Sequence, residues 1–168
     1  MSNINLLDDP NTDFYAFMKK GRIIGRGSTR LTYRCDKEIV IKVPKPRYFD
    51  LGQAQNEIEA GVYENASQKK FLAKVYHLES DFMVCERLRP IAKNKQTGSI
   101  INHLCSVGKE ELVDEIYHFI HQLSDEFHLH LMDLLEIGNW GIDRKGNYKL
   151  LDYGCTYELY TEIFEKVG

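Results

Sequence analysis

The sequence predicts an α+β fold in which a five-stranded antiparallel sheet with one main helix precedes a small helical part. Before residue 50, short runs rich in Ile, Val, Thr and Tyr are separated by Gly, Ser, Asp and Lys turn signals, a pattern typical of an antiparallel meander. After residue 50, apolar residues recur at helical spacing, and a clearer helical stripe begins near residue 109. Strands therefore dominate the first half and helices the second, which makes the arrangement α+β.

The first half is expected to contain all five strands of the sheet. Residues 1–12 predict a loose polar tail, and residues 13–19 predict one or two helical turns. Three strands follow in the runs GRIIGRG, LTYRCD and EIVIKV. Asp50 and Gln53 form a candidate capping box for the main helix. The runs FLAKVYHLES and DFMVCERLRPI predict the last two strands.

The second half is expected to be mainly helical. Residues 92–108 predict a connecting loop, and residues 109–129 predict a strongly amphipathic helix. Two short strands are expected near 140–142 and 148–151, and a terminal helix over 156–167. The chain is assigned to a single domain, 1–168, with three parts: a tail and short helix (1–19), a sheet-rich part (20–91) and a minimal helical part (92–168).

Composition argues against several classes of partner. The formal net charge is −3 and the pI is about 6.1, so the chain lacks the basic character of a nucleic-acid-binding protein. No apolar run reaches membrane-spanning length, and the N-terminus does not resemble a secretory signal. The four cysteines show no CxxC spacing, which favours reduced thiols in a protein core. A cytoplasmic protein is therefore expected.

Two segments of the predicted sheet carry candidate ligand-binding residues. In GRGSTRLTY, Gly25 and Gly27 would let the backbone approach a phosphate closely, and Ser28 offers a hydroxyl. A hairpin turn would produce the same pair of glycines. Lys42 is a single cation in the apolar run EIVIKV, and burying it without a partner would cost several kcal/mol. Lys42 is therefore expected to serve a ligand or an ion pair, unless it lies on an exposed edge strand.

Two later segments supply acidic and amide side chains. On the main helix, Glu57 lies nearer to the apolar stripe than Glu59 does at 100° per residue, so Glu57 is the predicted ion-pair partner of Lys42. Alternatively, Glu57 is an ordinary helical acid that faces solvent. The segment MDLLEIGNWGIDRKGNYKLLDYG then brings together Asp133, Asn139 and Asp152 around a short β-ribbon.

These four segments, in this order, resemble the signature set of the protein-kinase-like superfamily over roughly residues 20–156. With its severely truncated helical lobe, the chain resembles the minimal kinase-like proteins found among bacterial effectors and phage-encoded proteins. The resemblance implies ATP and Mg²⁺ as cofactors. It gives each candidate residue a role: Gly25, Gly27 and Ser28 for phosphates, Lys42 and Glu57 as their clamp, Asp133 as base, Asn139 and Asp152 for the metal, and backbone groups of Glu86 and Leu88 for the adenine.

The sequence departs from the superfamily at places that bear on catalysis. Met132 precedes Asp133 where an arginine is usual, and Asn139 comes six residues after Asp133 instead of five. Leu135 replaces a lysine that neutralises charge on the transferred phosphoryl group, and the loss of such an electrostatic contribution slows transfer. Only fourteen residues follow Gly154, so no activation segment or peptide-docking helices are expected.

Three functions are consistent with this resemblance. The first is a minimal ATP- and Mg²⁺-dependent protein kinase acting on Ser or Thr. The second is a pseudokinase, a nucleotide-binding or protein-binding regulatory module. The third is a small-molecule kinase, disfavoured because such enzymes build their acceptor pocket from long C-terminal helices. The expected partners are ATP and a protein substrate or partner, with no nucleic acid and no membrane. The cytoplasm would be that of the producing cell, or of a host for an effector or phage protein.

Overall fold

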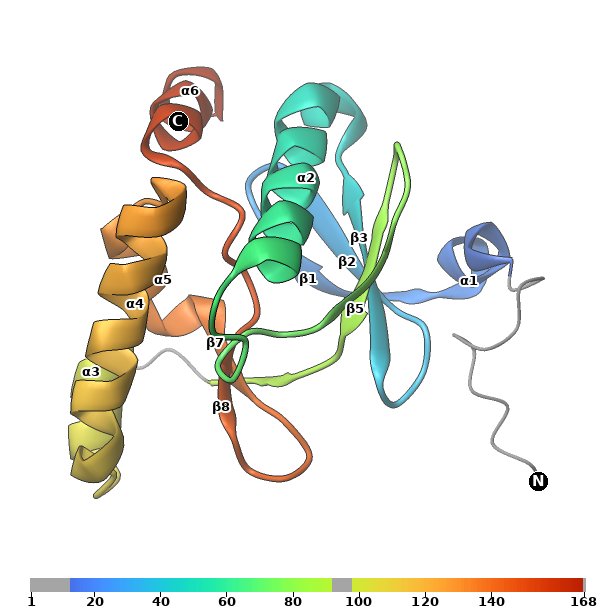
Figure 1. Ribbon diagram of the computed structural model, residues 1–168. Helices are drawn as coiled ribbons and strands as arrows, with labels where there is room; N and C mark the ends of the chain where they lie inside the picture. Colours follow the sequence, from blue (N-terminus) through green and yellow to red (C-terminus); the bar gives the residue numbers. More distant parts are fainter. Residues whose placement is uncertain (1–12, 92–97, 168) are drawn as a thin grey trace.

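A computed structural model describes residues 13–91 and 98–167. The expected tail at 1–12 and the first part of the expected loop, 92–97, lie outside the described residues. Figure 1 shows a sheet with one long helix against it, and the remaining large helices gathered to one side. No helix within the described ranges is long and apolar enough to cross a membrane.

The larger sheet has the five antiparallel strands that the sequence predicts. Its spatial order is β1-β2-β3-β5-β4, and every neighbouring pair is antiparallel. The central strand β3 is almost entirely buried, because EIVIKV supplies apolar side chains to both of its faces. The strands are β1 (Arg22–Arg26), β2 (Arg30–Arg34), β3 (Ile39–Pro44), β4 (Val75–Leu78) and β5 (Met83–Glu86).

The long helix α2 (Phe49–Asn65) packs on β3 and β4. The predicted capping box is wrong, since α2 begins at Phe49 and its N-cap residue, Tyr48, makes no side-chain capping bond. A 3-10 turn that starts at Pro46 leads directly into the helix. The chain is therefore already helical when it reaches Asp50, which lies in the first turn, where an acid favours the helix dipole.

After residue 88, the described residues form a small three-stranded sheet and four α-helices. The expected loop over 92–108 is only partly correct, because residues 100–106 form a helix, α3, whose first turn is capped by Ser99. A one-turn helix, α5, also forms where none was predicted. The elements are β6 (Arg89–Pro90), β7 (Trp140–Ile142), β8 (Tyr148–Leu150), α3 (Ile100–Ser106), α4 (Val113–Phe127), α5 (Leu131–Leu135) and α6 (Tyr157–Val167).

The short helix expected near the N-terminus is confirmed as α1 (Phe14–Lys20). Asp13 caps it by accepting a hydrogen bond from the Ala16 N–H at 3.0 Å. The cysteine prediction is only partly correct, because Cys105 is exposed although Cys85 and Cys155 are buried. All four are free thiols, and burial raises the pKa of Cys85 to about 12, so this thiol stays protonated.

The two parts of the molecule share their main core. Trp140 is fully buried there, and its indole N–H donates to the Leu134 carbonyl at 2.8 Å. The chain just before β4 is joined to β8 by backbone bonds: Ala73 N–H donates to the Leu150 carbonyl at 2.8 Å, and Leu150 N–H donates to the Phe71 carbonyl at 2.7 Å. These contacts fix the spacing between the sheet and the β7–β8 hairpin, and the candidate site lies in this region.

Candidate functional site

A cleft of about 440 Å³ lies where the sheet, α2 and the segments on either side of the β7–β8 hairpin meet. It gathers six of the predicted site residues: Gly27, Ser28, Lys42, Asp133, Asn139 and Asp152. Four chain segments that are distant in sequence thus contribute to one cavity. Tyr160 and Ile163 of α6 also line it.

Lys42 is buried in this cleft and forms an ion pair with Glu59. Its ammonium group also donates to the Leu151 carbonyl at 2.5 Å. The predicted pairing with Glu57 is wrong, because Glu57 is exposed and its carboxylate accepts a bond from Gln53 at 2.9 Å instead. The buried face of α2 carries the polar residues Asn56 and Glu59. A buried face assigned from the apolar residues alone is therefore the wrong one.

Arg30 is a second buried cation in the cleft, and sequence reasoning did not identify it as a site residue. It takes the place of the third glycine of the kinase pattern. Its guanidinium donates to Asn56 at 2.8 Å, to Glu59 at 3.1 Å and to Asp152 at 2.5 Å. We call Arg30, Lys42, Glu59 and Asp152 the cleft cluster. Its two cations and two acids are linked into one network.

The charges of the cleft cluster control its protonation. Burial acts to raise the pKa of the Asp152 carboxyl, but the charges of Arg30 and Lys42 outweigh burial and hold that pKa below its ordinary value. Burial likewise acts to lower the pKa of Arg30, and the carboxylates of Asp152 and Glu59 raise it instead. Asp152 is therefore an anion, and Arg30 a cation, at neutral pH.

Asp133 and Asn139 are held together at the other wall of the cleft. The Asn139 amide donates to the Asp133 carbonyl at 2.9 Å and to its carboxylate at 3.0 Å. The extra residue between them is accommodated because α5 and a 3-10 turn at Ile137–Asn139 bring the chain back on itself. Burial, followed by the negative charge of Asp152, raises the pKa of the Asp133 carboxyl to about 7.

The turn after β8 orients Asp152 toward the cleft. The neighbouring Tyr153 is fully buried, and its hydroxyl donates to the Ala73 carbonyl at 2.7 Å. Gly154 lies so close to α2 that a Cβ there would stand 2.2 Å from the Gln55 carbonyl oxygen. Only glycine fits at this contact, which explains the Asp-Tyr-Gly sequence in terms of packing.

The glycine-rich turn contributes less than expected. Gly27 and Ser28 line the cleft, and the Gly27 N–H is bonded to the Arg30 carbonyl at 3.0 Å. Gly25 lies within β1 opposite Thr32, where a Cβ would stand 3.2 Å from that side chain. Gly25 therefore serves the packing of two strands, and the cavity wall begins with the next residue, Arg26.

The two residues predicted to contact a base lie in different surroundings. The Glu86 N–H already donates to the Lys74 carbonyl at 2.8 Å, so it is not free for a base. Leu88 instead lines a second hollow of about 570 Å³, together with the apolar side chains Ile24 and Ile142. Of the two, Leu88 remains the candidate for a base contact.

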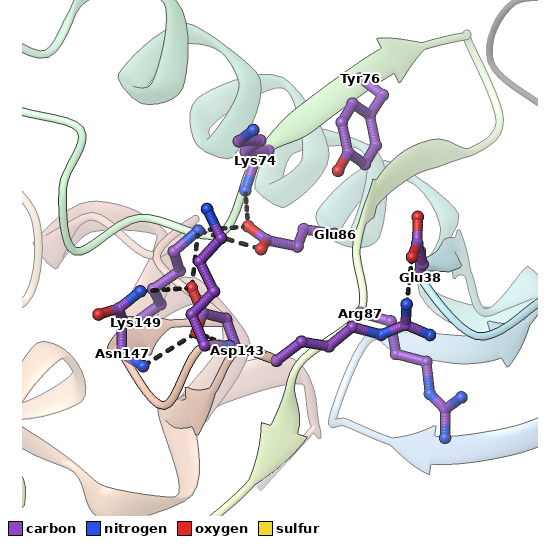
Figure 2. A pocket seen from close by; sticks show the side chains of 10 residues that line it. Glu38, Lys74, Tyr76, Glu86, Arg87, Asp143, Asn147 and Lys149 are labelled. Atoms are coloured by element: carbon purple, nitrogen blue, oxygen red, sulfur yellow. Dashed lines mark hydrogen bonds and ion pairs between the residues drawn. The ribbon is translucent and has the colours of Figure 1, made fainter. Parts of the chain in front are cut away.

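The carboxylate of Glu86 belongs to a third hollow, of about 320 Å³, which is shown in Figure 2. There Glu86 points toward Lys149 of β8, with oxygen-to-nitrogen distances of 2.7 and 3.0 Å. Asp143 lies 3.9 Å from the same ammonium group, and Arg144 pairs with Glu38. We call these five residues the outer cluster. It ties β5 and the turn before β3 to the β7–β8 hairpin.

The predicted magnesium ligands do not form a ready metal site. Within the ranges that the structure describes, no three Asp, Glu, His or Cys side chains are grouped so as to hold a metal ion. One oxygen of Asp152 is already bound by Arg30, whereas Asn139 donates to Asp133 through its NH2 group, which is not the atom that would bind a metal. Mg²⁺ is usually bound by one or two carboxylates together with substrate phosphates, and here the Asp152 carboxylate is already paired with the Arg30 guanidinium, so the donor set as it stands does not fit Mg²⁺.

No family model matches the chain, and no curated protein matches it. Among solved structures, the chain is similar to WbdD, described as a bifunctional kinase-methyltransferase, at 13% identity over 83% of this chain and 34% of WbdD, with a TM-score of 0.46. A co-crystal of WbdD with a kinase inhibitor matches at 12% identity over 77% of this chain and 31% of the other, with a TM-score of 0.46.

The chain is also similar to APH(2″)-IIa in a ternary complex with streptomycin and ATP. The identity is 15% over 70% of this chain and 52% of the other, with a TM-score of 0.36. The chain thus spans 31% to 52% of the length of these solved chains. Likeness at such identities leaves the assignment of function to the chemistry of the cleft.

Proposed function

We propose that the chain is a kinase-like phosphotransferase that takes a phosphoryl group from ATP and transfers it to a Ser or Thr hydroxyl of a protein. The observation that carries this proposal is the placement of Lys42 and Asp133 on the same cavity. Lys42 is a fixed cation, held by Glu59, and Asp133 is a carboxyl group whose pKa lies near neutrality. A cation for phosphates beside a base for a hydroxyl is what phosphoryl transfer requires.

The phosphates would bind at the sheet side of the cleft. Lys42 supplies charge, and Ser28 supplies a hydroxyl next to the backbone of Gly27. The base would lie in the second hollow, against the apolar side chains of Ile24, Leu88 and Ile142. Glu59 takes the role assigned to Glu57 from the sequence, because it fixes the Lys42 ammonium group in place.

Asp133 would act as the general base. Its carboxylate accepts the proton of the attacking hydroxyl while a bond forms between that oxygen and the terminal phosphorus. The bond from this phosphorus to the bridging oxygen breaks, and ADP leaves with the electron pair. Asn139 orients the carboxylate by donating to it at 3.0 Å. A pKa near 7 balances the fraction of free carboxylate against its basicity.

The surface beside Asp133 supports a protein acceptor rather than a small molecule. Four large apolar side chains are exposed on α5 and α6, with Met132 at 67% and Phe164 at 70%. Tyr160 is exposed at its outer side while it stacks on His130 and lines the cleft. An open apolar surface fits an extended peptide, whereas a small acceptor would need an enclosed pocket.

A regulatory nucleotide-binding module is the second candidate, and one observation favours it. Asp152 is bound by Arg30, so the charge arrangement is already balanced without a ligand. Such a protein would hold nucleotide and present the surface of α6 to a partner without transferring phosphate.

Transfer of labelled phosphate from ATP to a generic protein acceptor separates the two candidates. We expect transfer by the native chain, and its loss in Asp133→Asn with ATP binding retained. Asp125→Asn, on the exposed face of α4, is the matched control and should transfer at the native rate. Undiminished transfer by Asp133→Asn would reject Asp133 as the base. ATP binding without transfer in the native chain would favour the module.

The pH profile gives a second test of Asp133. The base works only when deprotonated, and its pKa of about 7 means that the active form is lost as the pH falls below neutrality. We expect the transfer rate to rise about tenfold per pH unit below this pKa and to level off above it. A rate that is flat between pH 5 and 8 would contradict the assignment.

A further inference from the structure

Arg30 contributes a buried positive charge to the wall of the cleft. Arg30 is the first residue of β2, directly after the glycine-rich turn, and lies opposite Pro44 in the sheet register. Its side chain turns inward and is only 5% exposed, although it lines the cleft. A long cationic side chain in this position places its charge beneath the turn that is proposed to cover the phosphates.

The contacts of Arg30 place its guanidinium on Asp152, the carboxylate that the sequence predicts as a metal ligand. Its Nη2 group lies 2.5 Å from Asp152 Oδ1 and 3.1 Å from Glu59 Oε2. Asp152 is the carboxylate that the sequence assigns to a metal, and Arg30 is its counter-ion. A divalent cation on the same carboxylate would stand close to the guanidinium, and like charges at such distances repel strongly in a buried site.

Arg30 also has donors to offer to a ligand. Its bonds to Asn56, Glu59 and Asp152 engage three of the five N–H groups that a guanidinium carries. Lys42 lies in the same cluster, because Arg30 binds one oxygen of Glu59 and Lys42 binds the other. Arg30 and Lys42 both line the cavity, so the cleft brings two cationic side chains, of the kinds that bind phosphate in proteins, to one wall.

We propose that Arg30 replaces a divalent metal in this cleft, so that with Lys42 it binds the phosphates of a nucleotide without Mg²⁺. The inference deepens the proposed function and rests on it, since the ligand is the same nucleotide. It assigns Arg30 a role in binding phosphate that no glycine at this position can fill. It also gives Asp152 the role of holding Arg30 rather than of holding a metal.

The test is a calorimetric titration of ATP into the native chain with Mg²⁺ and with EDTA. We expect the two dissociation constants to agree within about threefold. In Arg30→Met, which keeps an unbranched apolar stem but removes the guanidinium, binding in EDTA should weaken at least about tenfold. Arg34→Met, at the exposed end of the same strand, is the matched control and should behave as the native chain does.

Mn²⁺ titration in the absence of nucleotide, followed by electron paramagnetic resonance, provides a readout independent of ATP. The native chain should leave Mn²⁺ free, whereas Arg30→Met should bind it through the released Asp152. If ATP binding by the native chain requires Mg²⁺ and this requirement is unchanged in Arg30→Met, the inference fails and the proposed function survives. If the native chain binds no ATP at all, the proposed function and the inference both fail. Failure of Arg30→Met to bind Mn²⁺ would overturn the claim that Arg30 takes the place of a metal.

A conservative variant covers the case in which Arg30→Met does not fold. Asp152→Asn keeps the shape of the side chain and the position of Arg30 but removes the negative charge. If Arg30 binds phosphate directly, ATP affinity in EDTA should be unchanged or higher, because the guanidinium is less strongly held. A loss of about tenfold or more in EDTA would overturn the inference.

Discussion

The cleft cluster and the outer cluster both join the sheet to the chain around the β7–β8 hairpin, but they differ in burial. The side chains of Lys42 and Glu59 are 6% and 0% exposed, whereas those of Arg144 and Glu38 in the outer cluster are 58% and 63% exposed. Lys149 lies between these extremes at 11%. Because buried ion pairs are costly to break and exposed ones are not, the two clusters should respond differently to the same kind of substitution.

The clusters also differ in how their cations are held. In the outer cluster, Lys149 lies between the carboxylates of Glu86 and Asp143, an arrangement that fixes the hairpin against β5. In the cleft cluster, two cations share Glu59, and both line a cavity. We therefore propose that the outer cluster is a structural clamp and that the cleft cluster is a ligand site.

The largest effect is expected for Glu59→Gln. This change leaves Lys42 and Arg30 buried with half of their negative charge removed, and breaking a buried pair in this way costs about 3–5 kcal/mol of unfolding free energy. Urea denaturation measures it. Glu57→Gln, two residues earlier on the exposed face of α2, should change stability by less than about 0.5 kcal/mol. Equal losses in the two variants would contradict the assignment of Glu59 as the buried partner.

An intermediate effect is expected for Lys149→Met in the outer cluster. Removal of the ammonium group leaves Glu86 without its ion-pair partner in a mostly buried position, which should cost about 1–3 kcal/mol. Thermal denaturation measures this loss, and ATP affinity should stay at the native value. A variant that keeps native stability but loses ATP binding would show that the outer cluster is not a clamp.

The smallest effect is expected for Arg144→Gln. Its pair with Glu38 is exposed on both sides, so the loss of unfolding free energy should be below about 1 kcal/mol and should shrink further at high salt. Lys166→Gln, which breaks an equally exposed pair on α6, is the comparison. A cost as large as that of Lys149→Met would mean that this ion pair contributes more to the hairpin than its exposure indicates.

The sheet could be predicted from sequence because its strands are short apolar runs separated by turn residues. The buried face of α2 could not be predicted from sequence, because the side that meets the sheet carries the polar residues Asn56 and Glu59. The short helix α3 was missed because it begins at a Ser99 cap within a polar stretch. The periodicity of apolar residues identifies helices and strands whose buried side is apolar. It fails where the buried side chains are polar or charged and are paired with one another.

The candidate site shows the same limit. Lys42, Asp133 and Asp152 could be named because each occupies a distinctive local pattern. Arg30 could not, because its burial depends on Glu59 and Asp152, which lie 29 and 122 residues away in sequence. The arginine in place of the third glycine of the pattern was the available signal. Only the folded arrangement shows that this residue joins the cluster.

Calorimetric titration of ATP into the native chain, Lys42→Met and Lys149→Met tests most directly whether the cleft cluster is the ligand site. We predict binding by the native chain and by Lys149→Met with similar affinity, and a loss of at least about tenfold in Lys42→Met, because the cation that faces the cavity is gone. Far-ultraviolet circular dichroism of the three proteins controls for folding. Native affinity in Lys42→Met, with binding lost in Lys149→Met, would contradict the account and place the ligand at the outer cluster.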